Sequence, residues 1–452
     1  MSRRLLTLTT LTLFVAVCGA LLVAREGGAG GQSLLGTLSA GGARCNLDAT
    51  PSNFKQRVAA ASPGQTVCLA GGNYGNWSGT SKASPGITIT TRPGAAVRLG
   101  FQFSLANTQN FTVDGSANGG SISTPNEGMQ LSGNTNTPRN ITIQNVSFSG
   151  NEIDVDIDGP TNSNITFNHD LFDGSDCLGG GIDIHIEYSP NAPSGVTVEN
   201  SIIENGSSDG IQSGAAMKIV NNYFYKVIES NRSELSQCHT DAIQFVGMTG
   251  GQTTIEGNWF VDTADGIGSW NGDNAPGYLI ENNVFDHQVE ESAIVLHLDK
   301  GSRVIHNTCI DASDACIDLT GTSYQPSVGT VIKDNIFDAR YPYDLTYADP
   351  ARRIDNMVRA RAGDSDFDGI PRFVGGTNVP FTSRADYLLT SRSPGHNRAD
   401  DGTDVGAVSL NRIAYGPQAS EVNPFVWPFP PVADLQTCLA SIWCQQSGGS
   451  GQ

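Results

Sequence analysis

Three aspartates occupy matching places in three short phrases: Asp209 in SDGIQSG, Asp241 in TDAIQF and Asp265 in ADGIGSW. On successive strands of one parallel sheet, neighbouring carboxyls would lie about 5 Å apart. Like charges that close either raise one pKa or bind a cation, so the group is a candidate set of general acids or Ca²⁺ ligands. The same spacing suits the paired carboxylates of glycosidases. The alternative is turn chemistry, because an aspartate before a strand often caps the backbone.

Rings and polar side chains follow in the same segments. Strand alternation predicts two outward columns, one with His185, Trp270 and His297 and one with Asp183, Gln212 and Gln244. A tryptophan on a sheet face can stack on a sugar ring, and histidine carries protons near neutral pH. His239, two residues before Asp241, is a further candidate acid or base. The alternative is an ordinary solvated face.

The phrase HLDKGSRVIHN offers two cations in a chain where Lys and Arg are sparse. β-Elimination from a uronic acid needs a base for the C5 proton and positive charge against the carboxylate. Lys300 is a candidate base and Arg303 a candidate carboxylate ligand. The alternative is that DKGS is a surface turn.

Aspartates alternate in DSDFDG, at Asp364, Asp366 and Asp368. This spacing is typical of calcium loops, but the twelfth position is Gly375, which excludes an EF-hand. We expect a smaller Ca²⁺-stabilised turn or, as the alternative, a solvated acidic loop.

These residues need elements that position them, and a repeat supplies them. One phrase recurs every 21 to 36 residues: an apolar-x-apolar run, then polar residues that often include Asn, then an apolar anchor. Examples are ITIQNVSF, VTVENSII, KIVNNYF, LIENNVF and VIKDNIF. Such a period predicts a solenoid whose coils stack because none can bury its own apolar face. We predict an all-β, right-handed parallel β-helix with an internal asparagine ladder. A capping helix is predicted over Ser52–Ala61, with Ser52 as its N-cap.

Composition indicates where the parts of the chain begin and end, and which classes of partner are excluded. Residues 1–24 read as a signal peptide, or alternatively an N-terminal anchor, and 25–44 as a Gly-rich linker. The β-helix is predicted over 45–410, with a Pro- and aromatic-rich tail over 411–452 that packs on it. The net charge of −19 argues against a nucleic-acid partner. We expect a secreted, extracellular monomer.

Eight cysteines follow the predicted signal. An even number in an exported chain predicts disulfides, although sequence alone does not fix their pairing. Proximity favours Cys45–Cys68, Cys309–Cys316 and Cys438–Cys444, leaving Cys177 with Cys238.

From about Cys45 to Ala407 the chain resembles the right-handed parallel β-helix superfamily of pectate-lyase-like proteins. The segments that carry the resemblance are SPGQTVCLAGGNYGNW near the start, and PRFVGG, DYLLTSRSPGHN and DVGA near the end. The phrase IDIHIEY resembles the Asp-Pro-His-Glu phrase of mannuronan epimerases through Asp183 and His185, although Ile184 replaces the proline and Glu187 is one place late. The paired aspartates of polygalacturonases are missing. The resemblance therefore implies the fold and a carbohydrate-active protein, not one family.

The leading expectation is a polysaccharide lyase that cleaves a uronic-acid-containing glycan by β-elimination, with Ca²⁺ as a candidate cofactor. One alternative is a glycoside hydrolase that uses two of the three aspartates. The other is a non-catalytic carbohydrate-binding or adhesive β-helix.

Overall fold

A computed structural model describes residues 44–407 of the chain, apart from 101–102, 116–117, 126–127, 133–137, 150–152, 175–180, 189, 230–238, 271–276, 350, 360–364, 378, 380 and 382–383. The predicted signal, most of the predicted linker and the predicted tail therefore lie outside the described residues. Among the residues described, no helix combines the length and apolarity needed to cross a membrane.

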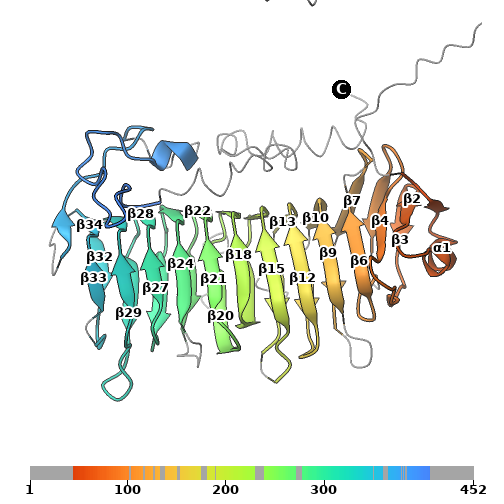
Figure 1. Ribbon diagram of the computed structural model, residues 1–452, viewed down its shortest axis with the longest axis horizontal. Helices are drawn as coiled ribbons and strands as arrows, with labels where there is room; N and C mark the ends of the chain where they lie inside the picture. The colour runs from red at the N-terminus through yellow and green to blue at the C-terminus, as the bar shows by residue number, and fades with distance from the viewer. Residues whose placement is uncertain are drawn as a thin grey trace, which may run out of the picture. The chain divides into compact units, whose positions relative to one another are not determined.

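The described part of the chain is a parallel β-helix, as the repeat predicts (Figure 1). Each full coil contributes one strand to each of three sheets, and neighbouring strands in a sheet come from successive coils. The first sheet contains β1 (Leu47–Ala49), β2 (Thr66–Leu69), β4 (Ile87–Thr91), β6 (Gln109–Asp114), β9 (Arg139–Gln144), β12 (Ser163–Asn168), β15 (Ser194–Glu199), β18 (Met217–Val220), β21 (Thr253–Glu256), β24 (Tyr278–Glu281), β27 (Arg303–Ile305), β30 (Val331–Lys333) and β33 (Arg352–Ile354).

The second sheet contains β3 (Gly72–Tyr74), β5 (Ala96–Leu99), β7 (Ser121–Pro125), β10 (Val146–Ser149), β13 (Leu171–Asp173), β16 (Ile202–Glu204), β19 (Tyr223–Tyr225), β22 (Trp259–Val261), β25 (Val284–Asp286), β28 (Thr308–Ile310), β31 (Ile336–Asp338), β34 (Met357–Val358) and β35 (Phe367–Asp368). The third sheet, which carries the candidate site, contains β8 (Met129–Gln130), β11 (Val155–Ile157), β14 (Ile184–Ile186), β17 (Ile211–Ala215), β20 (Asp241–Thr249), β23 (Asp265–Ser269), β26 (Ile294–His297), β29 (Ala315–Thr320) and β32 (Tyr341–Asp344).

The helix α1 (Phe54–Ala60) lies against β1 and β2, at the start of the solenoid. Its Phe54 ring packs edge-on against Tyr74 and Trp77. The predicted N-cap, Ser52, is wrong: Asn53 occupies that position, and no side chain caps the helix. The Asn53 side chain instead accepts a hydrogen bond from the Thr50 amide, 2.7 Å away, so the turn before the helix uses it.

Inward side chains of successive coils stack to form the core. Phe224, Phe260 and Phe285 lie above one another with ring centroids 4.6 to 4.7 Å apart. These distances match the spacing of paired strands, because identical register repeats each ring at the same place. The stacks leave little freedom for a strand to slip, since a slip by one residue would turn its apolar side chains outward.

The predicted asparagine ladder is present, and it is fully buried. Each side-chain amide donates to the carbonyl of the next ladder residue, and each carbonyl accepts a backbone N–H from the coil before it. The ladder residues are Asn222, Asn258, Asn283, Asn307, Asn335 and Asn356. A second polar residue precedes most of them at positive φ, where Asn, Asp and His are tolerated: Asn221, Asn282, His306, Asp334 and Asp355. One residue therefore turns the chain and the next ties the coils together.

The segment around residues 373–407 packs on the outside of the second sheet. Phe373, Phe381 and Tyr387 join an apolar cluster with Tyr223 and Trp259. Two predicted disulfides are confirmed, Cys45–Cys68 and Cys309–Cys316. Cys177, Cys238, Cys438 and Cys444 lie outside the described residues.

Candidate active site

The three aspartates lie on successive coils of the third sheet. Asp241 begins β20 and Asp265 begins β23, where the two residues are partners in register. Asp209 stands two residues before β17 and accepts the backbone N–H of Asp241 at 2.9 Å. The carboxyls are covered, because the three residues are only 3%, 0% and 2% exposed in chain order.

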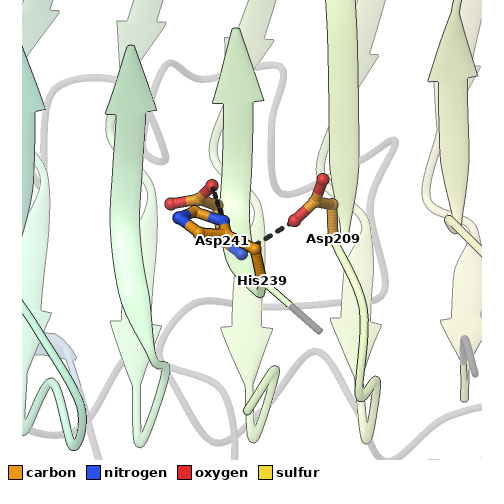
Figure 2. Close-up of side chains that lie close together, drawn as sticks. All are labelled: Asp209, His239 and Asp241. Carbon is orange, nitrogen blue, oxygen red and sulfur yellow. Dashed lines mark hydrogen bonds and ion pairs between the residues drawn. The ribbon is translucent and has the colours of Figure 1, made fainter. Parts of the chain in front are cut away.

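Asp241 is the centre of a hydrogen-bond network, and Figure 2 shows it with two of its partners, Asp209 and His239. Its Oδ2 accepts the Gln244 side-chain amide at 2.9 Å and lies 3.1 Å from His239 Nδ1. The Trp270 indole N–H points at both carboxylate oxygens from 3.3 Å. A buried carboxylate is stable only when donors surround it, and three side chains supply them, one on β20, one just after β23 and one just before β20.

His239 is the member of this network that reaches solvent, with 47% of its side chain exposed. Its hydrogen bond to Asp241 raises its pKa to about 9, against the opposing effect of partial burial, and the charges of Asp241, Asp209 and Glu291 add to the rise. The ring is therefore an imidazolium at neutral pH. It stands edge-on to Trp270, with ring centroids 5.0 Å apart.

The neighbouring carboxyls hold protons more tightly than free aspartate does. Burial, followed by the charge of Asp241, raises the pKa of Asp209 to about 7 and that of Asp265 to about 10. Glu291 contributes further to the rise at Asp265. At neutral pH Asp265 is thus a neutral acid.

Trp270 separates two histidines. Ser269 pairs with Leu296, so Trp270 and His297 occupy the same column on adjacent coils. Their ring centroids are 4.9 Å apart and nearly perpendicular. His297 Nε2 lies 3.5 Å from an oxygen of Asp318 on the next strand. The site therefore presents His239, Trp270 and His297 side by side.

The predicted column of three rings is wrong for His185. That residue is paired with Gln212, which in turn pairs with Gln244, two positions before the Trp270 column. The predicted columns place β14 two residues out of register, and such a shift preserves the alternation of inward and outward residues, so the sequence pattern does not reveal it. His185 Nδ1 lies 3.0 Å from Asp156, away from Asp241.

The same two-residue shift makes the predicted position of Asp183 wrong. It was expected on the outer face, but it is fully buried at the turn into β14, and neither of its carboxyl oxygens has a hydrogen-bond partner. Burial raises its pKa well above the usual value, and Asp154 on the preceding coil adds to the rise. Asp183 cannot touch a substrate from this position. Glu187, just after β14, is half-buried.

Sequence reasoning missed Tyr188. Its hydroxyl donates to the Gln212 side-chain carbonyl. The Gln212 amide then donates to Asp209 at 2.8 Å and to Gln244 at 2.7 Å. The signal was an aromatic residue directly after the alternating run of β14, in a position that the shifted alignment did not connect with Gln212.

The two predicted cations lie elsewhere. Arg303 begins β27, which belongs to the first sheet, where it pairs with Leu279 and Val331. Lys300 lies in the turn between β26 and β27, bridged to Val328, and is exposed. Neither residue is on the strands that carry Asp241 and Trp270.

Asp209, His239 and Asp241 could each turn one ligand atom toward a shared ion, because these atoms lie within 4.8 Å of one another. The donor set does not fit Ca²⁺, which prefers six or more oxygen ligands. Both Asp209 oxygens already accept N–H groups, and Asp241 accepts three side-chain donors. The other predicted calcium loop differs too: Asp366 accepts the amide of Asn356 and so ends the asparagine ladder. Asp368 lies in β35, and Asp364 lies outside the described residues.

No protein-family model matches the sequence, and no curated protein is similar to it. Solved structures similar to the chain include a pectate lyase, at 14% identity and a TM-score of 0.46, covering 81% of this chain and 97% of that one. A PL6-family polysaccharide lyase from Pseudopedobacter saltans has 13% identity and a TM-score of 0.46, covering 78% and 98%. The A-module of a mannuronan C-5 epimerase from Azotobacter vinelandii has 15% identity and a TM-score of 0.42, covering 69% and 94%. Similarity of this degree is too low to transfer an activity.

Proposed function

We propose that the protein is a polysaccharide lyase that cleaves a uronic-acid-containing glycan by β-elimination on the outer face of the third sheet. The observation that carries the proposal is the pairing of the exposed His239 with the fully buried Asp241, 3.1 Å apart. The covered Asp241 carboxylate cannot contact the sugar itself. It orients the His239 ring and favours its protonated form, and this ring contacts the sugar. Trp270 beside it provides a flat surface for a pyranose.

In this reaction the two histidines have different roles. The His239 imidazolium pairs with the uronate carboxylate, which withdraws charge from C5 and acidifies its proton. Asp318 beside Nε2 of His297 favours the tautomer with its proton there, so Nδ1 is the base. Nδ1 takes the C5 proton, the C5–H electron pair forms the C4–C5 double bond, and the C4–O4 bond breaks. The proton then passes from His297 to the leaving oxygen, so the enzyme returns to its starting state.

The hydrolase alternative fits the geometry less well. A retaining or inverting glycosidase needs two carboxyls that touch the substrate or its attacking water. Asp209, Asp241 and Asp265 are each at most 3% exposed, and their oxygens face protein donors or the interior. Their position suits them to orient His239 and raise its pKa, and not to act as an acid and base pair on the substrate.

We further propose that the protein acts outside the cell. The disulfides Cys45–Cys68 and Cys309–Cys316 support this, because such bonds persist in oxidising compartments.

Product analysis tests the reaction type. The protein would be incubated with alginate, polygalacturonate and a neutral xylan, and the digests assayed for unsaturated ends by ultraviolet absorbance and for reducing ends by a colorimetric assay. Absorbing ends formed in step with reducing ends are expected. Reducing ends without absorbance would establish a hydrolase, and binding without either product a non-catalytic protein.

A further inference from the structure

Two tyrosines at the C-terminal end of the third sheet are unusually exposed. Tyr324, in the turn after β29, is 94% exposed, and Tyr347, after β32, is 58% exposed. The two turns lie together, since the Ser327 amide donates to the Tyr347 carbonyl at 3.2 Å. Both strands are close to the C-terminal end of the coil stack (Figure 1). Large aromatic side chains are mostly buried, so two on neighbouring coils form a candidate contact surface.

Tyr347 occupies a corner of the coil whose backbone conformation recurs on an earlier coil. Its φ is 56°, in the left-handed region that disfavours bulky residues. On the preceding coil the equivalent corner position is Gly321, whose amide donates to the carbonyl of Thr346 at 3.0 Å. Leu298, the residue at this corner two coils earlier, has a similar φ of 55° but is half-buried, whereas Tyr347 is 58% exposed. The ring therefore has no evident structural purpose.

Tyr347 lies directly beside the column that contains Trp270. Trp270 is followed on the next coil by His297, which pairs with Thr320. Asp318 pairs with Asp344, which sets Thr320 opposite Thr346, the residue before Tyr347. Three strand steps of about 4.8 Å separate Trp270 from this end, roughly 14 Å in all, or about three sugar residues of an extended glycan.

We propose that Tyr324 and Tyr347 form a distal subsite that stacks on pyranose rings of the same polysaccharide chain that reaches Trp270. The assignment of a glycan as the occupant rests on the proposed function. Stacking suits this protein because it needs no positive charge, and the chain carries a net charge of −19.

The test is binding, measured in a His239→Ala background so that turnover does not intervene. Affinity electrophoresis in gels cast with alginate, polygalacturonate or xylan would compare four proteins: the background, Tyr324→Ala/Tyr347→Ala, Tyr324→Phe/Tyr347→Phe and the control Ile370→Ala. Ile370 is 61% exposed on the C-terminal segment. For the polymer that binds, the double Ala variant should lose about 5- to 30-fold in affinity, while the Phe variant and the control keep it.

The outcomes separate this proposal from the proposed function. If the unmodified protein binds a polymer through the tyrosines but does not cleave it, the lyase proposal fails and the subsite stands. Equal affinity of the double Ala variant and its background, or no binding to any of the polymers, would overturn the subsite. A dimer in light scattering that the double Ala variant loses would also overturn it, because a second copy of the chain would then be the occupant.

Discussion

Asp241→Asn changes the charge of one buried side chain and leaves its shape. The hydrogen bond to Asp241 is the largest cause of the rise in the His239 pKa from 6.5 to about 9, and the charge of Asp241 adds to it. Asp241→Asn removes the charge and replaces a charge-assisted hydrogen bond by a weaker neutral one, while burial opposes the remaining rise, so we expect the His239 pKa to fall to about 7.

The wild type and Asp241→Asn should differ most at pH values between their two His239 pKa values. At pH 8 His239 should be roughly nine-tenths protonated in the wild type and about one-tenth in Asp241→Asn. Activity that needs the imidazolium should fall as pH rises through about 9 in the wild type, and near neutral pH in the variant. Amide substitution keeps the size of the side chain and one oxygen that accepts N–H donors, so the fold should survive.

Histidine-selective carbon-13 labelling makes the experiment direct. The chain has seven histidines, and loss of one signal in His239→Ala assigns the resonance. Its chemical shift is then followed against pH in both proteins. If the midpoint in Asp241→Asn coincides with that of the wild type, the buried carboxylate does not charge the ring, and the reasoning fails.

The remaining predictions concern the ladder, the buried carboxyls, the sugar platform and metal dependence. Asn283→Ala removes bonds to Ile255 and Asn307 and should cost about 2–4 kcal/mol in urea unfolding, whereas the exposed control Asn73→Ala should cost almost nothing. The pKa of Asp154 is raised to about 8, so its contribution to stability is present below pH 4 and lost as pH rises toward 8; Asp154→Asn should therefore raise Tm at pH 8 but not at pH 4. Trp270→Ala should raise KM about tenfold more than Trp270→Phe, and equal effects would contradict its role as a platform. Chelation by EDTA should leave activity unchanged, and loss of activity restored by Ca²⁺ would show that a cation displaces the N–H donors around Asp241.

The fold was predictable because its signals repeat. Apolar alternation, turn residues and asparagines recur on every coil, so errors at one coil are corrected by the others. The stacking of Asp209, Asp241 and Asp265 followed from the same repetition. Local features that occur only once were harder to predict. Ser52 and Asn53 are both favoured N-cap residues, so residue type alone did not show which of them begins α1.

Side-chain roles were predictable only where register was fixed. A two-residue shift at β14 kept every inward residue inward, yet it moved His185 and Asp183 away from their true neighbours. Burial could not be read from residue type either, because an aspartate before a strand can face solvent or the interior. The pairing of His239 with Asp241 depends on the conformation of the two residues just before β20, which no repeat encodes.

One comparison tests the central claim most directly. His239 and His287 are both about half exposed and both pair with an aspartate, His287 with Asp262 at 2.6 Å. Formation of unsaturated ends from a polyuronate would be measured for the wild type, His239→Ala and His287→Ala at neutral pH. The account predicts that His239→Ala loses nearly all activity with its fold intact, and that His287→Ala keeps wild-type activity. Full activity in His239→Ala would contradict it.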